Sequence, residues 1–362
     1  MKLVIGTFLA AVAFCPVAAI TPGTKVAIGT FLAALQISPV AAITDGAFDA
    51  NDEYPSDGAL MLDFVEYGVP QYGYSPGCSG VLIHPKVFLT AAHCIAGSIF
   101  FDDEGYPLDR PLPGRRGEEP PAGEGPGIWV SFNKDPSDND AQGDKCVTCL
   151  DIKQAIFSPH YAGTGLGIGG DIAVVILKDG YTQAGPVQLP SLGYFDDLTV
   201  SKGLKKSPII NVGFGGSFDE ATKAKHDIEY LDMRMFSTST VKGLGPEYIG
   251  LNMHNNQDNG GSCYGGKLAL FFYWSHCAFI ASYFIWRGLS LDCRPSRFVD
   301  SGGSAYYTDE VGDLILAGLT SWGDANCIST SRIMRLDIQD SVDFIACIFG
   351  EVNGGEDYNI CN

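Results

Sequence analysis

Basic residues are scarce in this chain of 362 residues. Lysine and arginine number 23 against 42 aspartates and glutamates, which gives a formal net charge of −19. A surface of this sign repels phosphate backbones and anionic lipid headgroups, so we expect no nucleic acid partner and no membrane partner. The apolar fraction of 46% is enough for a folded core and excludes global disorder.

Helical periodicity and solenoid repeats are also scarce. From residue 58 onward the chain consists of short apolar or alternating runs bounded by glycine, proline or aspartate. Only SVDFIACIFG, near the C-terminus, has helical spacing. Many short strands with such turns are typical of a β-sandwich or β-barrel, so the predicted fold class is all-β with a short C-terminal helix.

The N-terminus has no apolar run long enough to span a membrane without a proline break. Lys2 precedes a short apolar run that ends in small residues, which is the pattern of a secretory signal. Residues 5–21 and 28–44 agree at 13 of 17 positions. We interpret residues 1–42 as a duplicated signal-like leader and predict a secreted, extracellular protein. A membrane anchor is the alternative, which the short, interrupted runs argue against.

The sequence also lacks a regular spacing of metal ligands. The acidic cluster at 135–146 reads as a solvated loop and not as a calcium site. Eleven cysteines in an oxidising compartment indicate disulfides, with Cys146–Cys149 and Cys347–Cys361 as local candidates. A zinc or redox role for the CxxC pair is the weaker interpretation. We expect no metal and no cofactor.

Three short motifs carry residues suited to acyl transfer. They are His93 in LTAAHC, Asp171 in GGDIAVVIL and Ser301 in DSGGS. Taken singly, each has a simpler structural explanation: a packed histidine, a turn aspartate and a glycine turn. Taken together, they supply a hydroxyl nucleophile, an imidazole to remove its proton and a carboxylate to fix the imidazole tautomer. Their order His, Asp, Ser differs from that of subtilisin and of α/β-hydrolases.

With SGVLIHPKVFLTAAHC, DIAVVIL, DSGGS and GLTSWG in this order, the chain resembles the chymotrypsin/trypsin family of serine endopeptidases. The resemblance covers residues 43–349 and makes 43–362 the protease domain. It implies two antiparallel six-stranded β-barrels with the site between them. It makes His93 the general base, Asp171 its orienting partner and Ser301 the nucleophile. Proteins or peptides would be the substrates of a monomeric enzyme.

The same resemblance implies the rest of the site. A neutral glycine at the base of the primary pocket argues against a preference for lysine or arginine and favours apolar side chains. The implied assignments are oxyanion-hole amides at Gly265 and Ser301, a substrate cleft formed by Gly261, Ser262, Ser321, Trp322 and Gly323, an N-terminal ion pair between Ile43 and Asp300, and disulfides Cys78–Cys94 and Cys263–Cys327.

Residues 266–299 interrupt the family pattern. In the family, the glycine that corresponds to Gly265 leads directly into the Asp-Ser-Gly-Gly turn, whereas here Val299 precedes it. The uncharged run 268–286 is long enough to span a membrane, but a span would thread a bilayer through the oxyanion loop. The flanking codons can encode a splice donor and an acceptor in frame. We therefore interpret 266–299 as a retained intron.

Two further alternatives remain open. Signal cleavage after Ala42 would make Ile43 the new N-terminus, whereas cleavage after Ala19 would leave an extension that needs a second cut. The function is either that of a secreted serine endopeptidase or that of a catalytically inactive relative that uses the scaffold for binding.

Overall fold

The computed structural model describes most of the two predicted barrels. It describes residues 42–44, 46–63, 74–95, 128–136, 148–161, 169–201, 203–215, 217–218, 228–229, 232–252, 261–263, 300–323, 330–355 and 358–361. The leader up to residue 41 and the inserted segment 266–299 lie outside these ranges. Among the described residues, no helix has the length and hydropathy needed to cross a bilayer.

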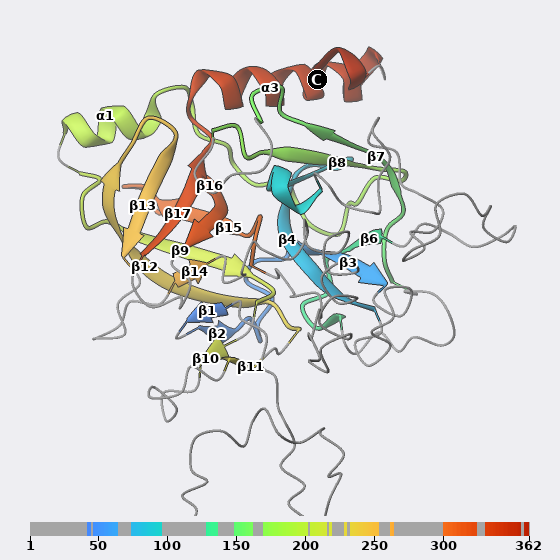
Figure 1. Ribbon diagram of the computed structural model, residues 1–362, viewed down its shortest axis with the longest axis horizontal. Coiled ribbons are helices and arrows are strands. Elements are labelled where there is room, and N and C mark those ends of the chain that lie inside the picture. The colour runs from blue at the N-terminus through green and yellow to red at the C-terminus, as the bar shows by residue number, and fades with distance from the viewer. Residues whose placement is uncertain are drawn as a thin grey trace, which may run out of the picture. The chain divides into compact units, whose positions relative to one another are not determined.

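Strands β3 to β8 form one antiparallel sheet. Its spatial order is β6-β3-β4-β5-β8-β7 (Figure 1). Among the described residues, its two end strands are linked only through one bridge between Val130 and Leu150 and not by a strand pairing, so the sheet is a half-barrel. The strands are β3 (Asp57–Asp63), β4 (Tyr74–His84), β5 (Val87–Thr90), β6 (Ile128–Ser131), β7 (Ile152–Phe157) and β8 (Ala173–Leu177).

Six later strands form a closed antiparallel barrel. The barrel closes because β13 pairs with both β17 and β12. A short strand, β2 (Ala47–Phe48), adds to β12 from outside. The barrel strands are β9 (Pro208–Gly213), β12 (Met235–Leu244), β13 (Tyr248–Asn252), β15 (Ser304–Thr308), β16 (Leu314–Gly323) and β17 (Thr330–Arg335).

Short elements complete the described fold. Strand β1 pairs with β14, and β10 pairs with β11. The remaining elements are β1 (Ala42–Thr44), β14 (Gly261–Cys263), β10 (Ser217–Phe218), β11 (Ile228–Glu229), α1 (Tyr194–Val200), α3 (Gln339–Gly350), 3₁₀ helices Ala92–Cys94 and Tyr358–Cys361, and the π-helix Glu351–Gly355.

The central strands are apolar on both faces because each face has its own core. In β8, Ala173, Val175 and Leu177 point into the first barrel. The alternate residues Val174 and Ile176 belong to a second core that also contains side chains from the closed barrel. Successive side chains of a strand point to opposite faces, so a two-sided strand needs a continuous apolar run. The run DIAVVIL is of this kind.

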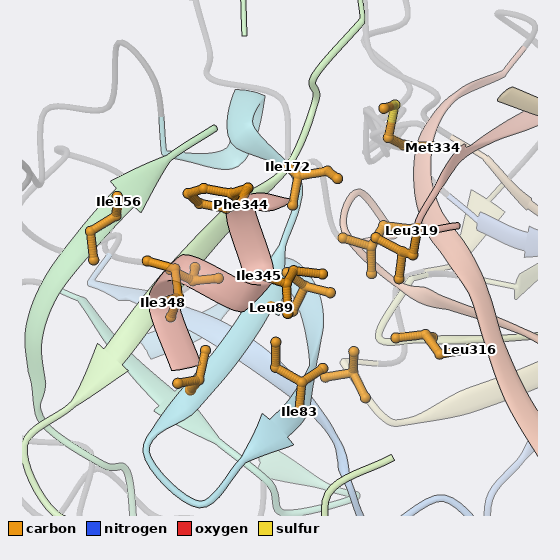
Figure 2. Close-up of a cluster of buried hydrophobic side chains, with 14 of the residues drawn as sticks. Ile83, Leu89, Ile156, Ile172, Leu316, Leu319, Met334, Phe344, Ile345 and Ile348 are labelled. Carbon is orange, nitrogen blue, oxygen red and sulfur yellow. The ribbon is translucent and has the colours of Figure 1, made fainter. Parts of the chain in front are cut away.

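The core between the barrels is capped by the C-terminal helix. Figure 2 shows Phe344, Ile345 and Ile348 of α3 beside Leu89 of the first barrel, with Leu319 of the second barrel across the same core. The three helix residues recur at the helical spacing that the sequence predicts. The predicted all-β class with its two barrels and C-terminal helix is thus confirmed, with the first barrel less completely closed than the second.

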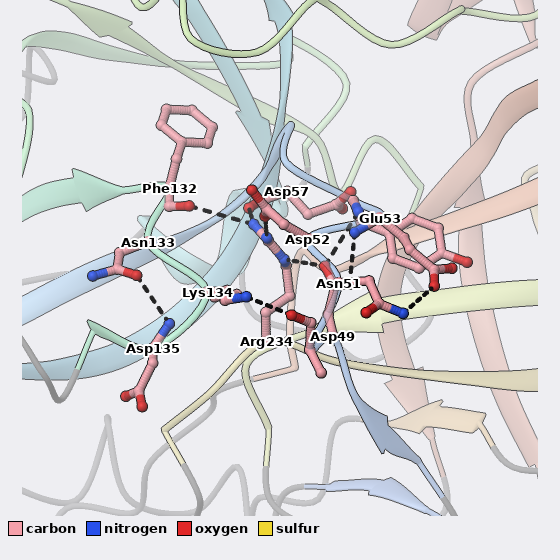
Figure 3. Close-up of polar contacts among 12 residues, drawn as sticks. Asp49, Asn51, Asp52, Glu53, Asp57, Phe132, Asn133, Lys134, Asp135 and Arg234 are labelled. Carbon is pink, nitrogen blue, oxygen red and sulfur yellow. Dashed lines mark hydrogen bonds and ion pairs between the residues drawn. The ribbon is translucent and has the colours of Figure 1, made fainter.

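A buried polar cluster also joins the barrels (Figure 3). Arg234, just before β12, is fully buried, and its Nε donates to Asp49 Oδ2 at 2.8 Å. Its Nη1 donates to the carbonyl oxygens of Asp57 at 2.9 Å and of Phe132 at 3.3 Å, and its Nη2 pairs with Asp52. One guanidinium thus holds the segment after β2 and two segments of the first barrel.

The Asp57 carboxyl group lies within this interface. The Tyr306 hydroxyl donates to Asp57 Oδ2 at 2.7 Å, whereas Oδ1 has no hydrogen-bond partner among the described residues. Burial raises the pKa of Asp57 from 3.8 to about 7, although the bond from Tyr306 and the charge of Arg234 act in the opposite direction. The nearby Asp49 carboxylate raises this pKa further.

The raised pKa predicts that Asp57 makes the protein less stable as the pH rises from about 4 to about 7. In this range the unfolded chain releases the proton while the folded chain keeps it, so the free energy of unfolding falls with pH. The loss due to Asp57 is up to about 4 kcal/mol. Asp57→Asn keeps the shape and removes the titration, so urea unfolding of this variant should show a flatter dependence on pH. An unchanged pH profile would contradict the prediction.

Candidate active site

His93 and Asp171 lie at the same end of two paired strands. The 3₁₀ helix that follows β5 carries His93, and Asp171 comes two residues before β8. Strands β5 and β8 are antiparallel partners, with Thr90 opposite Ala173, which brings the two side chains together. The distance between His93 Nδ1 and Asp171 Oδ2 is 2.8 Å, and the His93 backbone N–H donates to Asp171 Oδ1 at 3.0 Å.

The Asp171 carboxylate is kept ionised in a buried position. Asp171 is 5% exposed, and burial alone would raise the pKa of its carboxyl group. The charge of His93, the hydrogen bonds from His93 and a 2.5 Å bond from the Ser321 hydroxyl outweigh burial, so the pKa is lowered. An ionised carboxylate only accepts hydrogen bonds, so His93 Nδ1 carries the proton and Nε2 is left as the basic nitrogen.

The DSGGS turn is tight and buried. The Gly303 N–H donates to the Asp300 carbonyl oxygen at 2.9 Å, and the Gly302 N–H donates to the Thr320 carbonyl oxygen at 2.8 Å. Gly302 has a φ of 79°, and a Cβ at this position would overlap the backbone of Ser79. The turn therefore requires glycine at this position, for reasons of both dihedral angle and space.

Ser301 lies against the segment that carries His93. Its carbonyl oxygen accepts a bond from the Ser79 N–H at 2.8 Å and lies 3.6 Å from Cys94 Sγ. The structure contains the predicted Cys78–Cys94 disulfide, which links β4 to the 3₁₀ helix that carries His93. Ser301 Oγ is buried and makes no hydrogen bond to a described residue, so the structure has no hydrogen bond between Ser301 and His93.

Asp300 is buried beside the turn and accepts a hydrogen bond from the Gly215 N–H at 2.7 Å. Ile43 lies in β1 opposite Ser262 of β14. In the intact chain, the nitrogen of Ile43 is an uncharged peptide nitrogen. The predicted ion pair between Ile43 and Asp300 therefore requires cleavage after Ala42 and stays a prediction.

Three residues of the predicted substrate cleft lie in β16 and two in β14. Trp322, in β16, is half-buried, and the guanidinium of the exposed Arg332 lies 4.4 Å from the centroid of its ring. Gly323 is the last residue of the same strand. For Gly261 and Ser262 the structure gives only their place in β14, opposite Thr44 and Ile43 of β1.

Two other predicted features lie beyond the described part of the chain. Gly265, and Cys327 of the predicted disulfide with Cys263, are outside it. Elsewhere, the structure contains the Cys347–Cys361 disulfide, and Cys149 is disulfide-bonded.

Several neighbours of Asp171 could not be identified from the sequence. Ser321 is predicted to line the substrate cleft, and its hydroxyl also donates to the Asp171 carboxylate. Burial, and then the charge of Asp171, raise the pKa of Tyr248 to about 12, and they raise the pKa of Tyr161 as well. No sequence signal identifies these two tyrosines, because they reach Asp171 from β13 and from the segment after β7.

Comparisons with known proteins identify no relative of this chain. No protein-family model matches the chain, and no curated protein matches it in sequence.

Proposed function

We propose that this protein is a secreted serine endopeptidase that cleaves peptide bonds through an acyl-enzyme. The observation that carries the proposal is the buried, ionised Asp171 bonded to His93 Nδ1 at 2.8 Å, with Ser301 on a glycine turn beside it. This arrangement directs the basic Nε2 of the imidazole away from the carboxylate, where a serine proton can be removed. The likeness to the chymotrypsin/trypsin family motifs supports the same roles.

In the proposed reaction, Ser301 Oγ attacks the substrate carbonyl carbon while its proton passes to His93 Nε2. The Asp171 carboxylate stabilises the imidazolium that forms. The negative oxygen of the tetrahedral intermediate would accept hydrogen bonds from the backbone N–H groups of Ser301 and Gly265. The imidazolium then protonates the leaving amine. Water, deprotonated by the imidazole, hydrolyses the acyl-enzyme.

The inserted segment 266–299 affects this proposal directly. Gly265 joins Asp300 only when the insertion is absent, and only then does its N–H reach the oxyanion position that the family uses. We therefore expect the chain without 266–299 to be the active form. The small, neutral Gly261 favours substrates with an apolar side chain before the cleaved bond.

Covalent labelling with a fluorophosphonate probe tests the proposal. The secreted chain without 266–299 should gain the mass of the phosphonyl group on Ser301, and the Ser301→Ala variant should gain none. His93→Ala should slow labelling strongly, because the hydroxyl loses its base. A folded protein whose Ser301 stays unlabelled would instead support the alternative.

The alternative is a catalytically inactive binding protein built on the same two barrels. One observation favours it: Ser301 Oγ makes no hydrogen bond to a described residue, including His93. Catalytic hydrogen bonds are often long before the substrate binds, so labelling and not the resting geometry decides between the two functions.

A further inference from the structure

A hollow of about 480 Å³ lies between α1 and the end of β12, within the closed-barrel half of the protein. Leu204 and Val241, both buried, form part of its wall together with the partly buried Leu244. Its remaining wall includes three exposed lysines, which are Lys205, Lys206 and Lys242. The hollow thus has a floor formed by closely packed apolar residues, with Leu204 2% and Val241 1% exposed, and a rim of exposed lysines.

The three ammonium groups are not neutralised by the described part of the protein. None of them makes a hydrogen bond or an ion pair with a described residue. Two other described cations have carboxylate partners: Lys178 lies 3.5 Å from Asp151, and Arg335 pairs with Asp196 at 2.7 Å. In a chain with a net charge of −19, three adjacent lysines without carboxylate partners form a local region that attracts anions.

The backbone holds two of these lysines together. The Lys206 N–H donates to the Val241 carbonyl oxygen at 3.0 Å, and the Val241 N–H donates to the Ser207 carbonyl oxygen at 3.0 Å. These bonds tie the segment around Lys206 to the strand residue that precedes Lys242. The cationic rim is therefore built into the sheet.

Lys206 also adopts a costly backbone conformation. Its φ is 70°, in the left-handed region that glycine occupies without penalty. Glycine would adopt this conformation more readily, so replacing Lys206 by glycine removes the side chain without straining the backbone.

We propose that this hollow binds an acidic peptide segment that carries an apolar side chain. The apolar side chain would fill the space against Leu204 and Val241, and flanking carboxylates would pair with the three lysines. Sulfated polysaccharides and nucleic acids match the lysines less well as ligands, because the acidic surface elsewhere repels an extended polyanion. The site goes beyond the proposed peptidase activity and requires no chemistry at Ser301.

Fluorescence anisotropy with a short fluorescein-labelled peptide, in which glutamates flank a central phenylalanine, tests the proposal. The Ser301→Ala protein is used so that the peptide is not cleaved. The double variant Lys206→Gln/Lys242→Gln should bind the peptide about fivefold more weakly, since each exposed ion pair contributes little alone. The matched control Lys153→Gln/Lys178→Gln removes the same charge from the first barrel and should bind as the parent does.

Two further measurements distinguish a specific peptide-binding site from non-specific attraction of anions. A peptide with glycine in place of the phenylalanine should bind more weakly, and heparin should compete less well than the unlabelled phenylalanine peptide. Lys206→Gly should weaken peptide binding while its Tm is unchanged or raised, because glycine relieves the left-handed φ. The proposal is wrong if the peptide does not bind, if both double variants lose affinity equally, or if heparin is the better competitor.

Discussion

Replacing Asp171 by asparagine is expected to lower kcat by about 10⁴-fold in the form that lacks 266–299. The carboxylate accepts a hydrogen bond from the protonated Nδ1 of His93 at 2.8 Å. It accepts a second one from the Ser321 hydroxyl at 2.5 Å. An amide of the same shape can donate to Nδ1, which moves the proton to Nε2 and removes the base that Ser301 needs. Hydrolysis of a chromogenic peptide with an apolar residue before the cleaved bond measures the effect.

The control for this prediction is Ser321→Ala, which removes one hydrogen bond to Asp171 but leaves the carboxylate. Its kcat should fall far less than that of Asp171→Asn. Because the pKa of Asp171 is lowered on folding, its ionised form contributes stability above the ordinary value of 3.8, which is lost as the pH falls through the folded-state value. Circular dichroism should show that both variants fold at neutral pH. Equal kcat values for Asp171→Asn and the parent would refute the role of Asp171.

Replacing Arg234 by methionine is expected to cost about 3–5 kcal/mol of unfolding free energy. The guanidinium is fully buried, and its loss leaves the buried Asp49 carboxylate without its cation. It also leaves two buried carbonyl oxygens, of Asp57 and Phe132, without this donor. Urea-induced unfolding, followed by tryptophan fluorescence, gives the difference directly.

The double variant Arg234→Met/Asp49→Leu provides the matched control. When both charges are replaced by apolar groups, no buried charge of this pair is left uncompensated, so part of the stability should return. The recovery should be incomplete, because the carbonyl oxygens of Asp57 and Phe132 still lack the Arg234 donor and the N–H groups of Glu53 and Tyr54 lose the Asp49 acceptor. A single variant that costs less than about 1 kcal/mol would show that the Arg234 guanidinium does not hold the two barrels together.

The strands could be predicted well because their periodicity is local. Runs such as DIAVVIL are bounded by turn residues, and the helical spacing of α3 is visible in SVDFIACIFG. The closure of the second barrel could not be derived from such patterns. It depends on β13 pairing with both β12 and β17, which is a matter of three-dimensional register. The two-barrel arrangement was predicted only through the family resemblance.

In the candidate site too, local motifs could be predicted from the sequence, whereas contacts between distant residues could not. His93, Asp171 and Ser301 were identified because each lies in a short, recognisable motif. The contact between Ser321 and Asp171 joins residues 150 positions apart, and the ion pair between Arg234 and Asp49 joins residues 185 apart. Nothing in the local sequence around these residues indicates their partners, because burial in the folded chain creates the contact.

The second apolar face of the central strands also limits how such a protein can change during evolution. Either half, encoded alone, would present to water the side chains that now pack between the barrels under α3. Recombination that exchanged one half for that of a distant protein would have to match this surface residue by residue. The two halves therefore depend on each other for stability, although each has an interior of its own.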